Sequence, residues 1–348
     1  MKRSRRLSVV VTAALLLAFT LTLSACTGAA AATKVRVLIV PKFESGEISG
    51  DFPGEAQKFY EGYLAGCDEV EVPNAAPSSK FYMNEENGVG MLITGSGKTA
   101  TSLSMMALLG WDAYDFTDAW IVSVGCAGGS TGHNVFGDVV LVTAACDNDL
   151  GHRTDSTELD AGGEGHTWFY DSSFDDYSCQ RLNRELADRC FELIQDCPLR
   201  TTEISRSVLA TNFPGEEWAA RDPRVMYGSA VTGDTYWKGW HNHEDATYIV
   251  ETYGCDDEYA VTEMEEVAVV AAARCHGLAD RVVSLRTVVN MDTFLAGETP
   301  ESLWLGNDGF NETVDEGTTE TLDIFEPAME NLFDAGSIVI DAALAGEL

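Results

Sequence analysis

Basic residues are scarce in this sequence. Its 348 residues include only 22 Lys and Arg against 56 Asp and Glu, a formal net charge of −34 at pH 7. Four of the 22 basic residues lie within the first six positions, which leaves 18 for the rest of the chain. A field of this sign repels the phosphates of nucleic acids. We therefore do not expect nucleic acid as a partner.

Long apolar runs are also missing, apart from one near the start. The basic segment MKRSRR precedes the apolar stretch 7–23, and no other segment approaches the roughly 20 apolar residues that span a bilayer. Leu23-Ser24-Ala25-Cys26 resembles the lipobox of bacterial lipoproteins, which implies a signal peptide over 1–26 and lipidation of Cys26. We expect an extracytoplasmic protein, lipid-anchored to a bacterial membrane. An uncleaved membrane anchor is the alternative.

Cysteine and histidine lack the spacing of a metal site. Eight cysteines follow Cys26, and none forms a CxxC pair. His241 and His243 could form a pair, but no third ligand is clustered with them. We therefore expect no metal and no cofactor. Disulfides can persist outside the cytoplasm, and the pairing of these cysteines stays open.

The apolar pattern predicts one α/β domain over 34–348, after a tether at 27–33. Strands and helices alternate along the chain, without an internal repeat. A long acidic, glycine-rich loop is expected over 147–176. The expected strands are 35–40, 88–94, 119–124, 138–142, 205–209, 225–231, 259–262 and 282–289. The expected helices are 98–109, 178–196, a stretch from 233, 266–276 and 324–344.

Two glycine-rich turns follow predicted strands. Gly95-Ser96-Gly97-Lys98-Thr99 resembles the end of a P-loop, but a P-loop needs a glycine at position 92, where this chain has Leu92. The segments 95–97 and 125–129 would bring backbone to the ligand-binding edge of an α/β sheet. Plain turn chemistry is the more common reason for glycine after a strand. Asn311-Glu312-Thr313 fits a glycosylation acceptor, which a bacterial cell would not use.

The order of the motifs resembles the nucleoside phosphorylase superfamily over nearly the whole chain. This resemblance implies a single-domain α/β/α sandwich with a mixed central sheet. The matching segments are Gly95-Ser96-Gly97-Lys98, Val124-Gly125-Cys126-Ala127-Gly128-Gly129, Gly137-Asp138-Val139-Val140, Gly233-Asp234-Thr235-Tyr236 and Glu263-Met264-Glu265.

A closer resemblance is to the purine nucleoside permease family, a branch of that superfamily. The name does not fit a transporter here, because a permease needs several spanning helices. The usual pattern of the family at this place is Ser-Asn-Phe-Asp. This chain has Val289 in place of the serine and Met291 in place of the phenylalanine, and these two differences bear on the specificity for the base. The motifs are Phe43-Glu44, Asp147-Asn148-Asp149-Leu150, Gly233-Asp234-Thr235-Tyr236-Trp237, and Arg286-Thr287 followed by Asn290-Met291-Asp292.

The resemblance implies roles for individual residues. Glu265, with Glu263 in the same motif, would bind the ribose hydroxyls, and Met264 would pack under the sugar. Asn290 would contact N7 of the purine. Asp292 would donate the proton, and alternation at the end of a strand would send the side chains of Asn290 and Asp292 to one face.

Other residues would surround the base and the nucleophile. Tyr236 and Trp237 would lie against the base. Glu44 would position the attacking water, with Glu47 as the alternative. The remaining substrate-binding residues are Asp234, Gly97, Gly125, Cys126, Ala127 and Gly128.

The attacking group is predicted from the lack of cations. Some phosphorylases have an arginine where this chain has Ser123, and the first glycine loop supplies only Lys98. Because phosphate needs paired cations, we expect a purine nucleosidase that yields base and ribose for salvage. A phosphorylase is the alternative within the same class. A non-catalytic nucleoside-binding lipoprotein that assists a separate transporter is the other alternative, and a homo-oligomer stays open.

Overall fold

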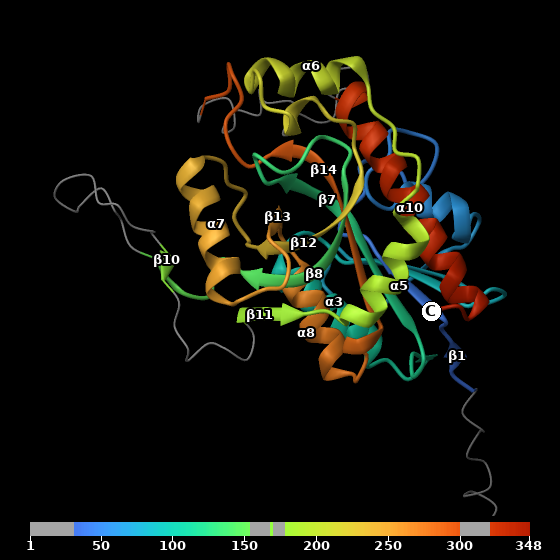
Figure 1. Cartoon of the computed structure of the whole chain (residues 1–348). Helices are drawn as coiled ribbons and strands as arrows, with labels where there is room; N and C mark the ends of the chain where they lie inside the picture. Colours follow the sequence, from blue (N-terminus) through green and yellow to red (C-terminus); the bar gives the residue numbers. More distant parts are fainter. Residues whose placement is uncertain (1–30, 154–167, 170–177, 300–320) are drawn as a thin grey trace, which may run out of the picture. The chain divides into compact units, whose positions relative to one another are not determined.

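The computed structural model describes residues 31–153, 168–169, 178–299 and 321–348 (Figure 1). Lys34–Leu348 forms one compact unit. Cys26 and the acceptor sequence 311–313 lie outside the described residues. Within the described ranges, no helix has the length and apolar content needed to cross a membrane.

Ten strands form one mixed sheet in the order β11-β8-β12-β13-β7-β2-β5-β4-β3, with β14 pairing both β7 and β8. Two short strands, β9 and β10, pair separately. The strands are β1 (Thr33–Lys34), β2 (Val37–Val40), β3 (Glu69–Val70), β4 (Lys80–Asn84), β5 (Val89–Ile93), β6 (Tyr114–Asp115), β7 (Trp120–Gly129), β8 (Val139–Asp147), β9 (His152–Arg153), β10 (Trp168–Phe169), β11 (Cys179–Arg181), β12 (Val225–Thr232), β13 (Tyr259–Glu263) and β14 (Val282–Met291).

The central strands close on themselves. β14 runs parallel to β7 and antiparallel to β8, while β12 runs parallel to both β8 and β13. β13 returns antiparallel to β7. The five strands β7, β14, β8, β12 and β13 therefore form a ring of pairings, which brings the ends of β7, β12, β13 and β14 together.

Helices cover both faces of the sheet. α3 and α8 pack against one face, and α2, α5 and α10 against the other (Figure 1). The helices are α2 (Gln57–Phe59), the π-helix η1 (Tyr60–Leu64), α3 (Lys98–Leu109), α5 (Arg184–Ile194), α6 (Glu203–Asn212), the 3₁₀ turn η4 (Trp218–Ala220), α7 (Trp240–Thr252), α8 (Glu266–Cys275), the 3₁₀ turn η5 (Ala279–Arg281), the π-helix η6 (Thr321–Phe325) and α10 (Glu326–Ala345).

The two-sided core follows from strand alternation. In β2, Leu38 and Val40 belong to the cluster under α3 and α8, whereas Val37 and Ile39 belong to the cluster under α10. A strand buried on both faces reads as a continuous apolar run. The mixed α/β sheet and the helix over 98–109 are confirmed.

Three expected elements differ from the structure. Residues 205–209 belong to helix α6, not to a strand, because Thr202 caps a helix there by accepting a hydrogen bond from the backbone N–H of Ser205 at 3.1 Å. Helix α5 begins only at Arg184, since residues 179–181 pair with β8. The stretch from 233 starts as a loop, and its helix begins at Trp240.

The segment 125–129 is not a turn. Strand β7 continues through Gly129, and β14 pairs with it over its whole length. A Cβ atom on Gly125 would lie 2.6 Å from Nη1 of Arg286 and 2.8 Å from Oε1 of Glu55. Glycine is therefore needed here because two side chains approach the backbone closely, not because the chain reverses.

Three cysteine sulfurs meet at the end of β8. Cys146 and Cys179 form a disulfide between β8 and β11. The Sγ atom of Cys255 lies 3.5 Å from that of Cys146 and 3.6 Å from that of Cys179. The bridge ties β11 to the strand that ends at Asp147.

Candidate active site

The predicted motifs meet at one end of the sheet. The backbone N–H of Gly97 donates to Oε1 of Glu265 at 2.9 Å, and the N–H of Lys98 donates to Oδ1 of Asp234 at 2.7 Å. Gly97 has a φ of +88°, a conformation that glycine adopts without strain. The first glycine loop, the loop after β12 and the loop between β13 and α8 are therefore in direct contact.

Glu263 stabilises the start of α8. Its Oε2 accepts hydrogen bonds from the backbone N–H groups of Glu265 and Glu266 at 2.7 and 2.8 Å. Thr232 and Arg286 also bond to its carboxylate. Negative charge at a helix N-terminus is favourable because the first N–H groups lack partners within the helix. Glu263 is thus fully engaged, whereas Met264 beside it is half-buried.

Glu265 is a buried carboxylate with fewer partners. It is 5% exposed, and its Oε2 lies 3.7 Å from Nη1 of Arg286. Burial raises the pKa of Glu265 to about 7, and the charges of Glu263 and Glu55 add to this effect while Arg286 opposes it. The side chain can therefore both accept hydrogen bonds from a ligand and exchange a proton near neutral pH.

Two buried cations lie beside the central glycine segment. Arg286 forms ion pairs of 2.9 Å with Glu263 and Glu266. Burial acts to lower the pKa of Arg286, but the surrounding carboxylates outweigh it and raise that pKa.

Lys42 is the second cation, and it overturns an expectation. Its Nζ donates to Oγ of Ser123 at 2.6 Å. A cation therefore lies next to Ser123, where the sequence predicted none. Burial and the nearby Arg286 lower the pKa of Lys42. The sequence could not place Lys42 there, because Lys42 follows strand β2 and Ser123 lies in the neighbouring strand β7, 81 residues away in the chain.

Glu55 is a site residue that the sequence did not reveal. It is 3% exposed. Its Oε1 accepts from the backbone N–H of Cys126 at 2.8 Å, and its Oε2 accepts from that of Lys42 at 2.7 Å. Its only sequence signal is that an acidic residue lies two positions before α2, after the irregular segment 45–54.

Glu44 has different surroundings. Its carboxylate accepts hydrogen bonds from four backbone N–H groups, those of Ser45, Gly54, Ala56 and Gln57. Burial raises the pKa of Glu44, and these four bonds oppose that shift. Glu44 therefore holds the segment 45–54 against the start of α2. Glu47 is exposed, and its N–H donates to Asp51.

Asn290 and Tyr236 are joined on the other side of the site. Nδ2 of Asn290 donates to the hydroxyl oxygen of Tyr236 at 2.9 Å. A Cβ atom on Gly128 would lie 3.4 Å from the same Nδ2, so Asn290 packs over β7. Tyr236 is 43% exposed. Trp237, in contrast, packs against a buried cluster, and Ala127 is buried within β7.

Asp292 has separate surroundings from Asn290. It is fully buried and hydrogen-bonded to Thr131, Tyr259 and His243. β14 ends at Met291 and has a register shift between Val288 and Asn290. Regular strand alternation therefore does not extend from Asn290 to Asp292, and the two side chains do not share one environment as the sequence predicted.

Lys98 is not free to bind an anion. Its Nζ forms ion pairs with Asp147 at 2.8 Å and with Asp149 at 2.9 Å. Burial acts to lower the pKa of Lys98, but these hydrogen bonds outweigh it and raise that pKa.

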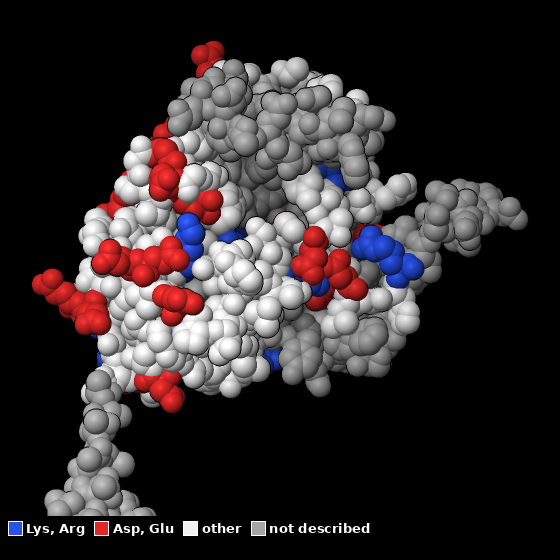
Figure 2. Space-filling model, turned by 180° about the vertical axis from the view of Figure 1, so that it is seen from behind, with Lys and Arg blue, Asp and Glu red and all other residues white. Residues whose placement is uncertain are grey.

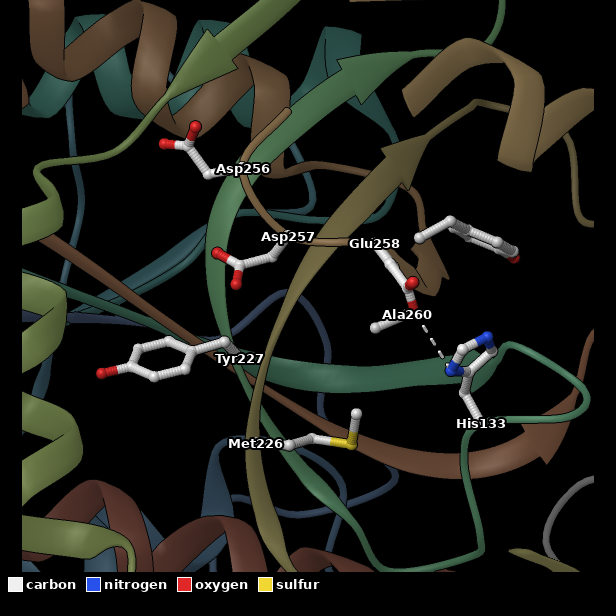
Figure 3. A pocket seen from close by; sticks show the side chains of 8 residues that line it. His133, Met226, Tyr227, Asp256, Asp257, Glu258 and Ala260 are labelled. Carbon is white, nitrogen blue, oxygen red and sulfur yellow. Dashed lines mark ion pairs between the residues drawn. The ribbon is translucent and has the colours of Figure 1, made fainter. Parts of the chain in front are cut away.

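A pocket of about 260 Å³ lies outside the motifs (Figure 3). It lies at the starts of β12 and β13, and Figure 3 shows the ion pair of 3.5 Å between His133 and Glu258 at one side. Asp257 in the same pocket pairs with Arg184 at 2.8 Å. Of the predicted site residues, none lines this pocket.

Comparison with known proteins agrees with the motif order. Residues 34–346 match the purine nucleoside permease family. A probable purine nucleoside permease of Schizosaccharomyces pombe is 25% identical over 286 residues, which cover 75% of this chain and 77% of that protein.

Solved structures show the same fold. Futalosine hydrolase of Helicobacter pylori has a TM-score of 0.52 at 12% identity, with 91% of this chain and 98% of that chain covered. A 5′-methylthioadenosine/S-adenosylhomocysteine nucleosidase of the same organism has a TM-score of 0.52 at 12% identity, with 92% and 100% covered. The family match extends over most of the sequence, and the chain therefore belongs to the purine nucleoside permease family.

Proposed function

We propose that this protein binds purine nucleosides and hydrolyses their N-ribosidic bond, which releases purine base and ribose for salvage. The observation that carries the proposal is Glu265, a buried carboxylate held between the first glycine loop and Arg286. Two solved proteins of the same fold are named as a futalosine hydrolase and a methylthioadenosine nucleosidase, which supports cleavage of this type of bond.

The sugar side of the reaction needs negative charge. As the bond to the base breaks, the ribose develops oxocarbenium character, and a preorganised carboxylate stabilises it. We propose that Glu265 accepts hydrogen bonds from the 2′- and 3′-hydroxyls, while Met264 packs under the ring. The low polarity around Glu265 strengthens both effects, because burial lowers the local dielectric constant.

The base side needs a flat surface and a hydrogen-bond donor. In our proposal the exposed ring of Tyr236 lies against the purine, and the amide of Asn290 contacts N7. Their mutual hydrogen bond fixes both groups before substrate arrives. The remaining walls of the site are formed by Asp234 and the backbone of Gly97, Gly125, Cys126 and Gly128. Trp237 packs against a buried cluster and thereby supports the loop that carries Tyr236.

We assign the attacking water to Glu55 in preference to Glu44 or Glu47. Each carboxylate oxygen of Glu55 accepts one backbone hydrogen bond, and the thiol of Cys126 also bonds to this carboxylate, which leaves acceptor capacity for one water. Glu44 uses its carboxylate for four backbone contacts within its own loop.

Charge around Glu55 favours water over phosphate. The buried cluster contains two cations and four carboxylates: Lys42, Arg286, Glu55, Glu263, Glu265 and Glu266. Lys98 is paired with two further carboxylates. A phosphate dianion would need unpaired cations to offset its desolvation, whereas water needs none.

One experiment distinguishes the proposed hydrolase from two alternatives. A phosphorylase would use the same base and sugar contacts. A nucleoside-binding lipoprotein that assists a separate transporter is favoured by the family name. We further propose that the protein is extracytoplasmic and held to the membrane by a lipid on Cys26. The same purified protein can be tested for homo-oligomerisation.

The test is incubation of the purified full chain with inosine, adenosine, guanosine or uridine, each with and without phosphate. We expect purine release without phosphate, free ribose as the sugar product, and no action on uridine. Ribose 1-phosphate as product would establish a phosphorylase instead. Tight binding of nucleoside without release of base over hours would establish a binding protein.

A further inference from the structure

The carboxylate of Asp292 cannot reach a substrate. It is 0% exposed. Its Oδ1 accepts from the N–H and the hydroxyl of Thr131 at 3.0 and 2.8 Å, and its Oδ2 accepts from the hydroxyl of Tyr259 at 2.9 Å. The remaining contact, at 2.8 Å, joins Oδ2 to Nδ1 of His243. Of these partners, His243 has the most exposed side chain.

His243 connects this buried carboxylate to the surface. Its side chain is 15% exposed, and its ring packs edge-on against Trp240 and Tyr259 at centroid distances of 5.3 and 5.8 Å. Within the part of the chain that the structure describes, its Nε2 has no hydrogen-bond partner. One ring nitrogen is thus held by a carboxylate, and the other is available.

The loop before α7 connects the base side of the site to His243. It follows the end of β14 closely, because Tyr236 bonds to Asn290 at 2.9 Å and the N–H of Gly239 donates to the carbonyl of Asp292 at 2.8 Å. One turn of helix later, His243 bonds to the Asp292 side chain.

We propose that His243 is the general acid that protonates the departing purine, and that Asp292 is its positioning residue. This inference rests on the proposed hydrolysis. The amide of Asn290 can donate a hydrogen bond but cannot release a proton. A carboxylate on Nδ1 fixes the orientation of the ring, which leaves Nε2 as the nitrogen that transfers a proton.

In the proposed step, the C1′–N9 bond breaks and its electron pair moves into the purine. The proton on Nε2 of His243 moves to a ring nitrogen of the purine, and His243 becomes neutral. The water oxygen forms the new bond to C1′ while Glu55 takes one of its protons. Glu55 then releases its proton to bulk water, and His243 regains one from bulk water.

The decisive comparison uses two leaving groups. His243→Gln should lower kcat on inosine by about 10² to 10⁴ and change KM only severalfold. With p-nitrophenyl β-D-ribofuranoside, whose phenolate departs without protonation, the same variant should stay within about threefold of wild type. His241→Gln is the matched control, because His241 lies on the same helix with 87% of its side chain exposed.

Two further measurements separate catalysis from folding. Asp292→Asn should show the same dependence on the leaving group, since it acts through His243. Added imidazole should restore inosine hydrolysis to His243→Ala. Equal losses on both substrates, a change in KM alone, or no rescue by imidazole would overturn the role of His243. If wild type cleaves p-nitrophenyl riboside and inosine at no measurable rate, the proposed hydrolysis itself fails and the acid role fails with it.

Discussion

Glu263 and Glu265 stand two residues apart in one motif, yet their surroundings differ. Glu263 satisfies the first backbone N–H groups of α8, and Glu265 receives one N–H from the glycine loop and lies near Arg286. A side chain that caps a helix contributes to stability, whereas a buried carboxylate with a raised pKa is typical of a functional site. The two residues should therefore respond differently to substitution.

Glu265→Gln tests the sugar site. The substitution keeps the shape of the side chain and removes its charge. The transition-state stabilisation, measured from kcat/KM for inosine, should therefore fall by about 2 to 4 kcal/mol. The far-UV circular dichroism spectrum should not change. Wild-type turnover by this variant would contradict the role of Glu265 and direct attention to Glu263.

The pH dependence of stability gives an independent test of the same residue. The pKa of Glu265 is raised from its ordinary value of 4.5 to about 7. Between these values the folded state holds a proton that the unfolded state has lost, so the free energy of unfolding falls as pH rises. Glu265→Gln lacks this effect. Relative to the variant, wild type should lose about 3 kcal/mol between pH 4 and pH 8.

Urea unfolding of both proteins at several pH values would measure this difference. Parallel curves for wild type and Glu265→Gln would contradict the raised pKa. In activity assays, kcat/KM of wild type should rise through about pH 7, because only the ionised carboxylate accepts hydrogen bonds from both ribose hydroxyls.

Glu55 and Glu44 form a matched pair for the nucleophile. Glu55→Gln should lower kcat by about 10² or more, since a general base typically contributes that much, and should leave nucleoside Kd within severalfold. Glu44→Gln should instead lower stability by about 1 to 3 kcal/mol, because the amide cannot accept all four backbone N–H bonds. The reverse pattern, with turnover lost in Glu44→Gln alone, would restore Glu44 as the water-positioning residue.

At the scale of elements, the glycine-rich end of strand β7 resembles a turn in the sequence, although its glycines serve close packing. Its glycines lie in a regular strand, where they admit Arg286 and Glu55 against the backbone. Helix α6 shows the opposite case: a β-branched and polar segment becomes helical because Thr202 caps it, and it buries only Ser205 and Leu209. In β7 tertiary contacts override the local pattern, whereas in α6 a local capping bond does so.

The disulfide between β8 and β11 predicts an unusual stability pattern. It closes a loop with a sequence separation of 33, for which chain entropy gives about 3 to 4 kcal/mol. Cys179→Ser should cost less than this, because Cys255 lies 3.5 Å from Cys146 and can replace the lost partner. The double variant Cys179→Ser/Cys255→Ser should show the full loss in non-reducing urea unfolding.

Cys275→Ser is the control for that series, because Cys275 is an exposed free thiol. Equal losses in the single and double variants would show that Cys255 does not take over the pairing. Peptide mapping of Cys179→Ser under non-reducing conditions would identify the Cys146–Cys255 bond directly.

At the scale of the whole molecule, acidity is found both outside and inside. Carboxylate side chains form several patches on the face seen in Figure 2, where Lys and Arg are few. The buried cluster likewise has more carboxylates than cations. Both features disfavour anionic substrates such as nucleotides, since charge of one sign raises the free energy of binding an anion. Neutral nucleosides face no such cost.

The location of the molecule gives the last prediction. If Cys26 carries a lipid, Cys26→Ser should abolish labelling with a radioactive fatty acid in a bacterial host and release the protein from the membrane fraction. Cys67→Ser is the control, because Cys67 lies within the folded unit. Labelling that persists in Cys26→Ser would contradict the lipobox assignment.

The sequence alone determined the class of fold, the order of the motifs and the family, because apolar periodicity and short glycine and acidic motifs are local properties of the chain. It also predicted Glu265, Asn290 and Tyr236 as substrate contacts, because their types are typical of a nucleoside site. Only the tertiary structure decided which carboxylates are free. Glu55, Lys42 and His243 take their surroundings from partners distant in sequence, and the same packing occupies Glu44, Glu263 and Asp292 with hydrogen bonds that no spacing rule predicts.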